Sequence, residues 1–345
     1  MNTPDRFDNT RDERALDPAR VIVDPHHHLW DHGDAAGVAS GSKPFLLQDF
    51  VRVIDDSGHR VTRTVYVECS SMYRREGPRE FAPIGETEFA NGMAAMSASG
   101  RYGDCCVAAG IVGSANLRLG ANVAPILEAQ VAAGNGRLRG IRFPTAYADA
   151  GLFGQPPDPT RKGILLEAAF RDGVRTMQRF GLSLDVWCLH TQLGELADLA
   201  SSCADVTIIL DHLGTPLQLD ASSEPNSEVF THWRAGMTEL ARRPNVVVKL
   251  GGLGMDVTAP IGRAGGQANS SELAREWQPY IETCIDIFGA GRCMFESNYP
   301  VDSTTCTYGA LWNAFKSIAA ACSEDEKTAL FSGTATAVYR LGSRA

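Results

Sequence analysis

The sequence predicts an α/β fold, a (β/α)8 TIM barrel with enlarged strand-to-helix loops. Apolar runs of strand length occur eight times along the 345 residues, and helical patterns lie between them. Most of these runs lack polar alternation, which is typical of parallel strands covered on both faces. A doubly wound sheet is the alternative, but it usually has a glycine-rich turn after its first strand. This chain has three histidines there.

Each predicted strand is a short and largely apolar run. In chain order, the predicted strands cover residues 21–23, 64–67, 106–112, 140–143, 182–189, 206–210, 246–250 and 293–295. The predicted helices cover residues 46–56, 86–99, 123–133, 164–180, 193–202, 228–242, 272–288 and 324–339. Residues 72–83, 156–162 and 253–271 are rich in glycine, proline and polar residues. We expect these three stretches to be loops that build the mouth of a pocket.

Composition and charge limit the classes of molecule that this protein is expected to bind. The formal net charge is -9 and no block of lysines and arginines occurs, which argues against nucleic acid or an anionic membrane as a partner. Residues 1–20 are polar, so we expect an amino-terminal arm rather than a signal peptide, followed by one barrel domain over residues 21–345. No apolar run approaches membrane-spanning length. Nine scattered cysteines without a C-x-x-C motif predict reduced thiols in a cytoplasmic protein.

A histidine cluster follows the first predicted strand, in the segment Val21-Ile22-Val23-Asp24-Pro25-His26-His27-His28. In an extended chain His26 and His28 share one face, and His27 points to the other. Neutral imidazole is the commonest protein ligand for zinc, and an H-x-H at a strand end directs two rings at one ion. A surface cluster is the alternative, so the interpretation depends on partners elsewhere in the chain.

Those partners are expected at the carboxyl ends of the other strands, where the active site of a TIM barrel lies. Four of the eight histidines in the chain are found at predicted strand ends. The candidates in strand order are His26 and His28, Glu68, Arg142, His190, Asp211 and His212, Lys249, and finally Glu296, Asn298 and Asp302.

His190 and His212 both follow strongly apolar runs. His212 suits a general acid or base, because the pKa of an imidazole lies near the working pH of most enzymes. The structural alternatives are a core histidine at position 190 and a strand-capping pair of Asp211 and His212.

Two cationic residues also stand at predicted strand ends. Arg142 is expected either to hold a substrate carboxylate through two parallel hydrogen bonds or to form a salt bridge with a nearby acid. Lys249 interrupts an apolar run, and a lysine inside a barrel must be paired or functional. For Lys249 we expect an ion pair with Glu68 or Glu296.

In combination, the strand-end motifs resemble those of the amidohydrolase superfamily, over residues 21–339. More narrowly, they resemble the amidohydrolase-related TIM-barrel hydrolases. That branch includes sugar-lactone hydrolases, pyrone dicarboxylate lactonases and, more distantly, aminocarboxymuconate semialdehyde-type decarboxylases. The motifs are Asp24-x-His26-x-His28, His190, Asp211-His212-Leu213-Gly214, Lys249-Leu250-Gly251-Gly252-Leu253 and Met294-Phe295-Glu296-Ser297-Asn298-Tyr299-Pro300.

The resemblance implies roles for these residues. His26, His28 and His190 would bind a divalent metal, with zinc as the first candidate, or polarise a substrate carbonyl as in the metal-free lactonases. His212 would serve as ligand, acid or base, and Arg142 would hold a substrate acid group.

The eighth strand departs from the family pattern, which usually has a glycine and, two residues later, an aspartate. Here these positions are Glu296 and Asn298. An amide cannot take a proton from water and is a weak ligand for a divalent cation. Glu296 and Asp302 are the candidates to replace the missing carboxylate, and metal-free chemistry is the alternative to zinc.

The expected function is hydrolysis of a lactone that carries a carboxylate or hydroxyl groups, with a small molecule as the partner. Arg142, Glu68, Lys249 and Asn298 are the expected substrate-binding residues. Alternatives are a metal-dependent, non-oxidative decarboxylase and a non-catalytic ligand-binding barrel. Barrels of this kind commonly pair, so a homodimer is one state that the sequence allows.

Overall fold

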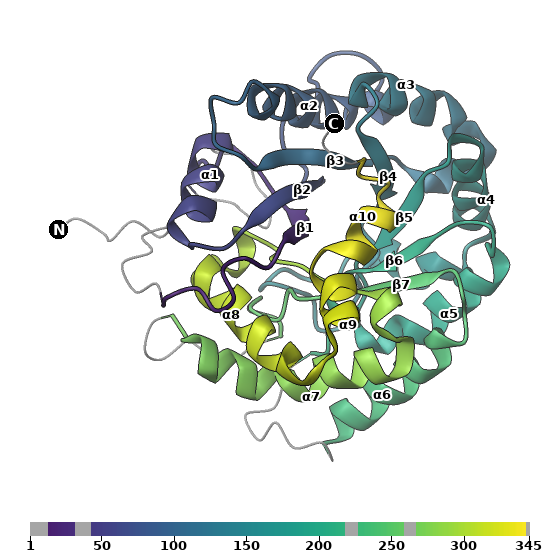
Figure 1. Cartoon of the computed structure of the whole chain (residues 1–345). Coiled ribbons are helices and arrows are strands. Elements are labelled where there is room, and N and C mark those ends of the chain that lie inside the picture. The colour runs from purple at the N-terminus through teal and green to yellow at the C-terminus, as the bar shows by residue number, and fades with distance from the viewer. Residues whose placement is uncertain (1–12, 32–42, 218–226, 259–266, 343–345) are drawn as a thin grey trace.

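A computed structural model of the chain describes residues 13–31, 43–217, 227–258 and 267–342. Eight parallel strands form one sheet in the order β1 to β8, surrounded by helices, which confirms the predicted TIM barrel (Figure 1). The strands are β1 Ile22–His27, β2 Val61–Val67, β3 Cys106–Ser114, β4 Leu138–Arg142, β5 Ser183–Val186, β6 Ile208–Leu210, β7 Val246–Leu250 and β8 Cys293–Phe295.

The ring of strands closes between β1 and the segment that follows β8. The backbone N–H of Asn298 donates to the carbonyl of His26 at 3.0 Å, and the N–H of His28 donates to the carbonyl of Tyr299 at 2.8 Å. Asp24 strengthens this seam by accepting hydrogen bonds from Ser297 Oγ at 2.6 Å and from the backbone N–H of Ser297 at 3.0 Å. The seam therefore fixes His26 and His28 against the segment after β8 that carries Glu296.

The α-helices begin and end close to the predicted positions for most of the chain. They are α1 Leu47–Asp56, α2 Ile84–Ala98, α3 Ala124–Gly134, α4 Ala168–Met177, α5 Leu193–Ser202, α6 Glu228–Ala241, α7 Ser270–Phe288, α8 Tyr308–Ile318, α9 Glu324–Thr328 and α10 Thr334–Val338.

One helix prediction is wrong. The helix that follows β8 in the outer ring is α8, whereas the sequence pattern predicted a single helix over residues 324–339. Nearly every residue of α8 is buried, so it lacks the polar face that marks an amphipathic helix in a sequence. The predicted segment forms α9, a π-helical stretch and α10, which pass across one end of the barrel (Figure 1).

The interior of the barrel is filled by side chains from alternate strand positions, as in other barrels of this type. They pack against residues of the chain's carboxyl-terminal segment, which covers the amino-terminal end of the barrel. The cluster comprises Val23, Val65, Val67, Val112, Ile209, Val247, Met294, Ala335, Tyr339 and Leu341. The opposite end of the barrel is left open for a site.

The predicted loops are partly described. The 72–83 loop contains the 3-10 turn Arg79–Phe81, and the 156–162 loop contains the turn Pro159–Arg161. Residues 259–266 of the predicted 253–271 loop lie outside the described residues, as do residues 1–12 of the predicted arm. The described part of the arm binds α8 of its own chain, where Leu16 N donates to Asn313 Oδ1 at 2.8 Å. Among the described helices, none combines the length and apolarity needed to cross a bilayer.

Candidate active site

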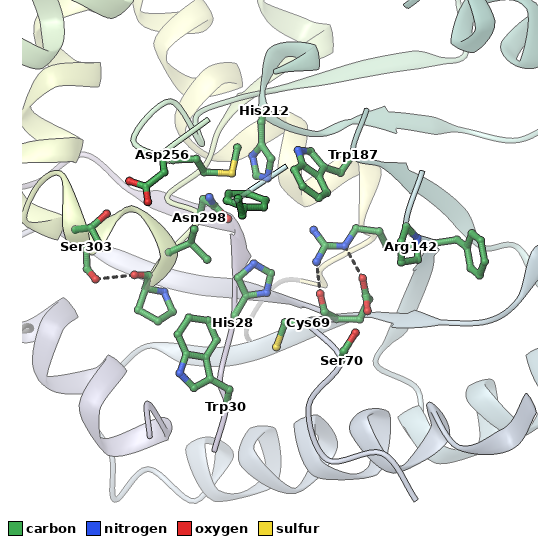
Figure 2. A pocket seen from close by; sticks show the side chains of 18 of the residues that line it. His28, Trp30, Cys69, Ser70, Arg142, Trp187, His212, Asp256, Asn298 and Ser303 are labelled. Carbon is green, nitrogen blue, oxygen red and sulfur yellow. Dashed lines mark hydrogen bonds and ion pairs between the residues drawn. The ribbon is translucent and has the colours of Figure 1, made fainter. Parts of the chain in front are cut away.

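A cavity of about 310 Å³ opens at the carboxyl ends of the strands (Figure 2). Aromatic side chains form much of its wall, and the basic, acidic and amide groups face it from several strands. Its lining comprises His28, Trp30, Lys43, Glu68, Cys69, Ser70, Arg142, Phe143, Pro144, Phe153, Arg161, Trp187, His212, Met255, Asp256, Asn298, Pro300, Val301, Ser303 and Thr304. A concave, largely apolar site with a few polar groups is the usual form of a small-molecule site.

The three histidines at the end of β1 point to two different sides, as predicted. His27 faces the helices, where its ring stacks on Phe50 with centroids 4.4 Å apart. His28 lines the cavity, and its Nδ1 lies 2.7 Å from the carbonyl of Val67. His26 is fully buried behind the cavity, with its Nε2 3.3 Å from Nε2 of His28. Burial lowers the pKa of both His26 and His28, and the charge of Lys249 lowers that of His26 further.

His212 and Glu296 form the central pair of the site. Glu296 Oε1 lies 2.6 Å from His212 Nδ1, and Oε2 of the same carboxylate lies 2.7 Å from His26 Nδ1. Burial alone would raise the pKa of Glu296, but His212 and His26 lower it below its ordinary value. The ionised carboxylate fixes the proton of His212 on Nδ1, which leaves Nε2 as the nitrogen able to accept a proton.

The backbone holds His212 in a conformation that L-residues rarely adopt. Its φ is 56°, and the next residue, Leu213, has a φ of 53°. Consecutive left-handed residues are costly and are concentrated at functional sites. Gly252 makes this arrangement sterically possible, because a Cβ there would lie only 2.2 Å from His212 Nδ1. Gly251 likewise leaves room for Glu296, since its Cβ would lie 2.6 Å from Glu296 Cγ.

Lys249 is fully buried within the barrel and pairs with two aspartates. Its Nζ lies 2.7 Å from Asp185 Oδ2 and 2.9 Å from Asp211 Oδ1. Nζ also lies 3.2 Å from His26 Nδ1, and Asp185 Oδ2 accepts a hydrogen bond from the hydroxyl of Tyr339 at 2.5 Å. Burial alone would lower the pKa of Lys249, but Asp185 and Asp211 raise it and keep the ammonium charged. The predicted ion pair of Lys249 with Glu68 or Glu296 is therefore wrong.

Arg142, labelled in Figure 2, forms an ion pair with Glu68, and both residues line the cavity. Arg142 Nε donates to Glu68 Oε1 at 2.8 Å, and Nη2 donates to the backbone carbonyl of Glu68. The remaining Nη1 lies 3.5 Å from Asp211 Oδ2 and 3.4 Å from His26 Nε2. Burial alone would lower the pKa of Arg142, but Glu68 and Asp211 raise it. Arg142 therefore forms the predicted salt bridge and also faces the cavity.

Asn298 and Asp302 are the remaining predicted residues of the eighth strand's end. Asn298 lines the cavity with a φ of 50°, and its Nδ2 donates to Asp302 Oδ1 at 2.8 Å. Asp302 is fully buried and accepts a second hydrogen bond from Gly254 N at 3.0 Å. Of the two candidate carboxylates, Glu296 contacts the histidines, whereas Asp302 supports the amide of Asn298.

His190 lies apart from the other predicted histidines. The β5 strand ends at Val186, so His190 begins a turn rather than ending the strand. Its Nδ1 accepts a hydrogen bond from Leu217 N at 3.2 Å, and its ring contacts His232. His190 is not among the residues that line the cavity. The predicted trio of metal-binding histidines is not assembled in this structure.

Two residues of the buried network were not predicted, Asp185 and Tyr339. Asp185 interrupts the apolar run of the fifth strand as Lys249 interrupts that of the seventh. The same argument, that a charge inside a barrel needs a partner, would have identified it. Tyr339 belongs to the carboxyl-terminal segment, and its position beneath the strands depends on how that segment folds.

A first group of nitrogens resembles part of a zinc site. The Nε2 atoms of His26 and His28 lie 3.3 Å apart, but the described residues place no third imidazole or carboxylate beside them. A catalytic zinc normally has three protein ligands. Moreover, Arg142 Nη1 lies 3.4 Å from His26 Nε2, so a guanidinium stands beside the nitrogen pair.

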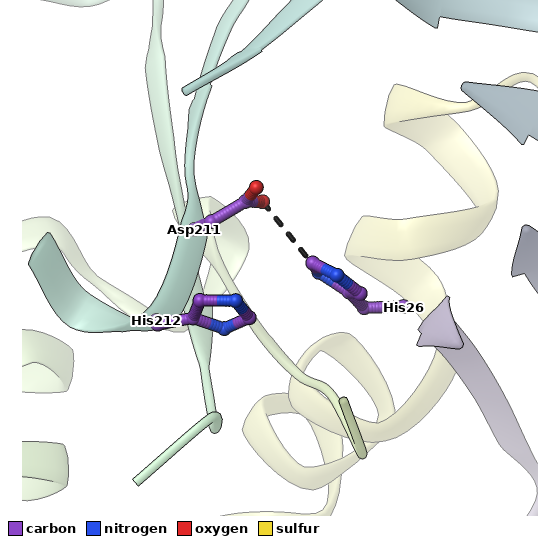
Figure 3. A group of neighbouring side chains, drawn as sticks. All are labelled: His26, Asp211 and His212. Atoms are coloured by element: carbon purple, nitrogen blue, oxygen red, sulfur yellow. Dashed lines mark ion pairs between the residues drawn. The ribbon is translucent and has the colours of Figure 1, made fainter. Parts of the chain in front are cut away.

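A second group consists of His26, Asp211 and His212, whose ligand atoms lie within 4.8 Å of one another (Figure 3). Lys249 Nζ contacts two members of this group, His26 Nδ1 at 3.2 Å and Asp211 Oδ1 at 2.9 Å. Glu296 already binds the Nδ1 atoms of both histidines. Because a fixed ammonium occupies the donor set, these residues do not fit a tightly held divalent cation.

Known proteins resemble this chain over most of its length. Residues 23–341 match the family described as amidohydrolase. An uncharacterised Sinorhizobium fredii protein, y4mH, is 32% identical over 93% of this chain and 99% of its own length. An L-fucono-1,5-lactonase from Burkholderia multivorans is 28% identical over 92% of this chain and 96% of its own. The crystal structure of a Burkholderia multivorans amidohydrolase with bound zinc is 25% identical, covers 93% of this chain and 100% of that chain, and has a TM-score of 0.71.

Proposed function

The chain belongs to the amidohydrolase family, and we propose that it hydrolyses a lactone that carries an acid group. The observation that carries the proposal is the Glu296–His212 pair, in which a buried carboxylate fixes the tautomer of a cavity-lining imidazole. Such pairs supply the general base for attack by water on a carbonyl. The resemblance to a fuconolactonase supports a lactone as the ester.

In the proposed reaction, His212 Nε2 takes a proton from a water molecule, whose oxygen attacks the lactone carbonyl carbon. Glu296 stabilises the imidazolium that forms. The ring C–O bond then breaks, and His212 returns the proton to the departing alkoxide. The product is the open-chain hydroxy acid, so one lactone and one water are consumed.

Arg142 and Asn298 are the hydrogen-bond donors proposed to stabilise the developing oxyanion, because both line the cavity with His212. In this proposal His26 does not touch the substrate, since it is fully buried and contacts His28, Glu296 and Lys249. It acts by positioning Glu296.

The proposed substrate class follows from the composition of the cavity. Lys43 and Arg161 line its walls in addition to Arg142, which favours an anionic substrate. Trp30, Phe153 and Trp187 offer flat apolar faces against which a small ring can pack. We propose that these groups select a cyclic ester with one acid group.

The proposed chemistry uses no resident metal. Arg142 lies beside the first candidate group of metal ligands, and Lys249 lies beside the second. A zinc ion, if bound, would polarise the carbonyl or activate water. Elemental analysis of the purified protein is expected to find zinc well below one atom per chain, and a chelator is expected to leave the rate unchanged. Stoichiometric zinc together with loss of activity on its removal would contradict this part of the proposal.

The test of the catalytic pair is Glu296→Gln, assayed on a panel of sugar lactones and carboxylated lactones. We expect kcat to fall by about 100-fold or more, because positioned acid-base groups contribute at least that much. Glu276→Gln is the matched control, since Glu276 is a half-buried carboxyl group of α7 whose Oε1 has no hydrogen-bond partner. Its activity should match that of the unaltered protein.

Two outcomes would contradict the proposal. Unaltered protein that hydrolyses no lactone on the panel, with or without added zinc, would overturn the assignment of a lactonase. Release of carbon dioxide from an unsaturated acid, without uptake of water, would instead identify a decarboxylase on this scaffold.

A further inference from the structure

A second cavity, of about 240 Å³, lies at the amino-terminal ends of β2, β3 and β4, away from the candidate active site. Arg63 of β2 and Arg137, just before β4, contribute to its lining. Leu341 and Gly342, which follow α10, line it from the carboxyl-terminal segment. Figure 1 shows this end of the chain beside β3. Neither the strand-end motifs nor the proposed reaction uses this cavity.

Two arginines line this cavity, Arg63 and Arg137, and two more, Arg139 and Arg340, lie close to Arg137 in the fold. In the described parts of the chain, none of them forms a salt bridge with a carboxylate, and Arg63 has no hydrogen-bond partner for its side chain. Arg137 donates to the neutral amide oxygen of Asn91 at 2.6 Å. Arg340 Nη2 donates to the backbone carbonyl of Arg139 at 3.4 Å, which places the last two arginines side by side.

Arg139 has backbone carbonyls as its hydrogen-bond partners, since its Nη1 donates to Gly136 O at 2.8 Å and to Leu138 O at 3.1 Å. Its Nε is buried without a hydrogen-bond partner. Burial lowers the pKa of Arg139, and the charges of Arg340 and Arg137 lower it further. Positive charges that gather at a concave surface raise the local potential and therefore attract an anion.

We propose that this cavity binds a small phosphate-type anion, held by the guanidinium groups of Arg63 and Arg137. Guanidinium groups bind phosphate oxygens through two parallel hydrogen bonds, which a lysine cannot do. The cavity is smaller than the roughly 300–1,000 Å³ of sites for drug-sized ligands. It therefore suits inorganic phosphate or the phosphate end of a small phosphomonoester.

Binding at this cavity would also stabilise the carboxyl-terminal segment. Leu341 and Gly342 line the cavity, and Tyr339, two residues earlier, holds Asp185 inside the barrel. An anion that fixes Leu341 therefore acts on the same segment that covers the amino-terminal end of the barrel. This predicts that the anion raises the melting temperature as well as binding.

The experiment titrates the full-length protein with inorganic phosphate and with glycerol 3-phosphate, at constant ionic strength maintained with chloride. Melting temperature and calorimetric binding are measured together. We expect a saturable rise in melting temperature for the unaltered protein. Arg63→Gln should weaken binding by about tenfold or more, because a charge-assisted bidentate contact is lost. A response to glycerol 3-phosphate alone would identify the phosphomonoester as the ligand, and an equal response to both would identify the shared phosphate group.

Arg234→Gln is the matched control, since Arg234 is an exposed arginine on α6 and the substitution removes the same charge. It should bind the anions as the unaltered protein does. No saturable response, or an equal loss in Arg63→Gln and Arg234→Gln, would overturn the proposal. So would binding that survives in Arg63→Gln but is lost in Arg142→Gln, because the anion would then occupy the active-site cavity.

Discussion

Asp302 is a fully buried carboxyl group whose charge state depends on its surroundings. Burial raises its pKa to about 7, although His212 and the hydrogen bonds from Asn298 and Gly254 act in the opposite direction. In the unfolded chain the pKa of this carboxyl group returns to its ordinary value of 3.8. Between these two values the folded protein binds the proton more tightly, so folding is favoured at the lower pH and this stabilisation is lost as the pH rises toward 7.

The prediction at this residue concerns stability as a function of pH. Between pH 5 and pH 8 the unaltered protein should lose roughly 3 kcal/mol more free energy of unfolding than Asp302→Asn, because the amide does not titrate. Urea denaturation at the two pH values measures the difference. Asp286→Asn, which replaces an exposed carboxylate of α7, should keep the pH dependence of the unaltered protein. An identical pH dependence in Asp302→Asn would show that Asp302 is ionised throughout.

Single residues were predictable where they directly follow a strand, because the site of a TIM barrel lies at the carboxyl ends of its strands. Glu68, Arg142, His212 and Asn298 were all predicted from their positions after apolar runs, and all four line the cavity. The rule placed His190 wrongly, because a predicted run of eight residues contained a strand of only four. Apolar residues beyond the strand belong to its buried loop, and hydrophobicity alone does not separate the two.

The segment after β7 determines the geometry of the catalytic pair. Gly251, Gly252 and Gly254 pack against Glu296, His212 and Asp302, respectively. Gly252 is the most restrictive of these positions, because its φ is +65° and a Cβ there would overlap the imidazole of His212. In the sequence these glycines are visible only as part of a motif. The motif does not reveal that side chains from other strands pack against them.

At this element we predict the effect of Gly252→Ala. The methyl group should displace the His212 ring from Glu296 and lower kcat by about 100-fold, since a misplacement of about 1 Å can have an effect of this size. The left-handed φ should also lower the free energy of unfolding by about 1–2 kcal/mol. Steady-state kinetics and urea denaturation measure the two effects.

The control for this prediction is Gly92→Ala in α2, where a Cβ would meet nothing within 4 Å. That substitution should leave kcat unchanged and raise the free energy of unfolding by about 0.5–1 kcal/mol, because alanine is the better helix former. Full activity in Gly252→Ala would mean that the position of His212 does not depend on this turn.

At the scale of the whole molecule, the two ends of the barrel are connected by buried polar contacts. Tyr339, from the segment beneath the strands, binds Asp185, and Asp185 binds Lys249. Lys249 in turn contacts Asp211 and His26, which lie directly behind the cavity. The architecture itself was predictable, because eight apolar runs and the helices between them are local patterns. The course of the last segment was not, since its buried aromatic and polar contacts are all long-range.

We predict that Tyr339→Phe, which keeps the ring but removes the hydroxyl, lowers the free energy of unfolding by about 1–3 kcal/mol. The reason is that a buried carboxylate loses a donor, and Asp185 Oδ1 already lacks a hydrogen-bond partner. Tyr147→Phe is the control, because its hydroxyl makes an exposed hydrogen bond to Asp149. That variant should change stability by less than about 0.5 kcal/mol. Equal effects of the two substitutions would show that the Tyr339 hydroxyl does not support the network.

The position of Tyr339 in the chain also bears on how the protein is made. Every residue that lines the active-site cavity, from His28 to Thr304, precedes Tyr339 in the sequence. Synthesis proceeds from the amino terminus, so a chain interrupted after Thr304 carries the whole cavity lining without the hydroxyl that holds Asp185. The hydrogen bond from Tyr339 to Asp185 can therefore form only after every residue that lines the cavity has been synthesised.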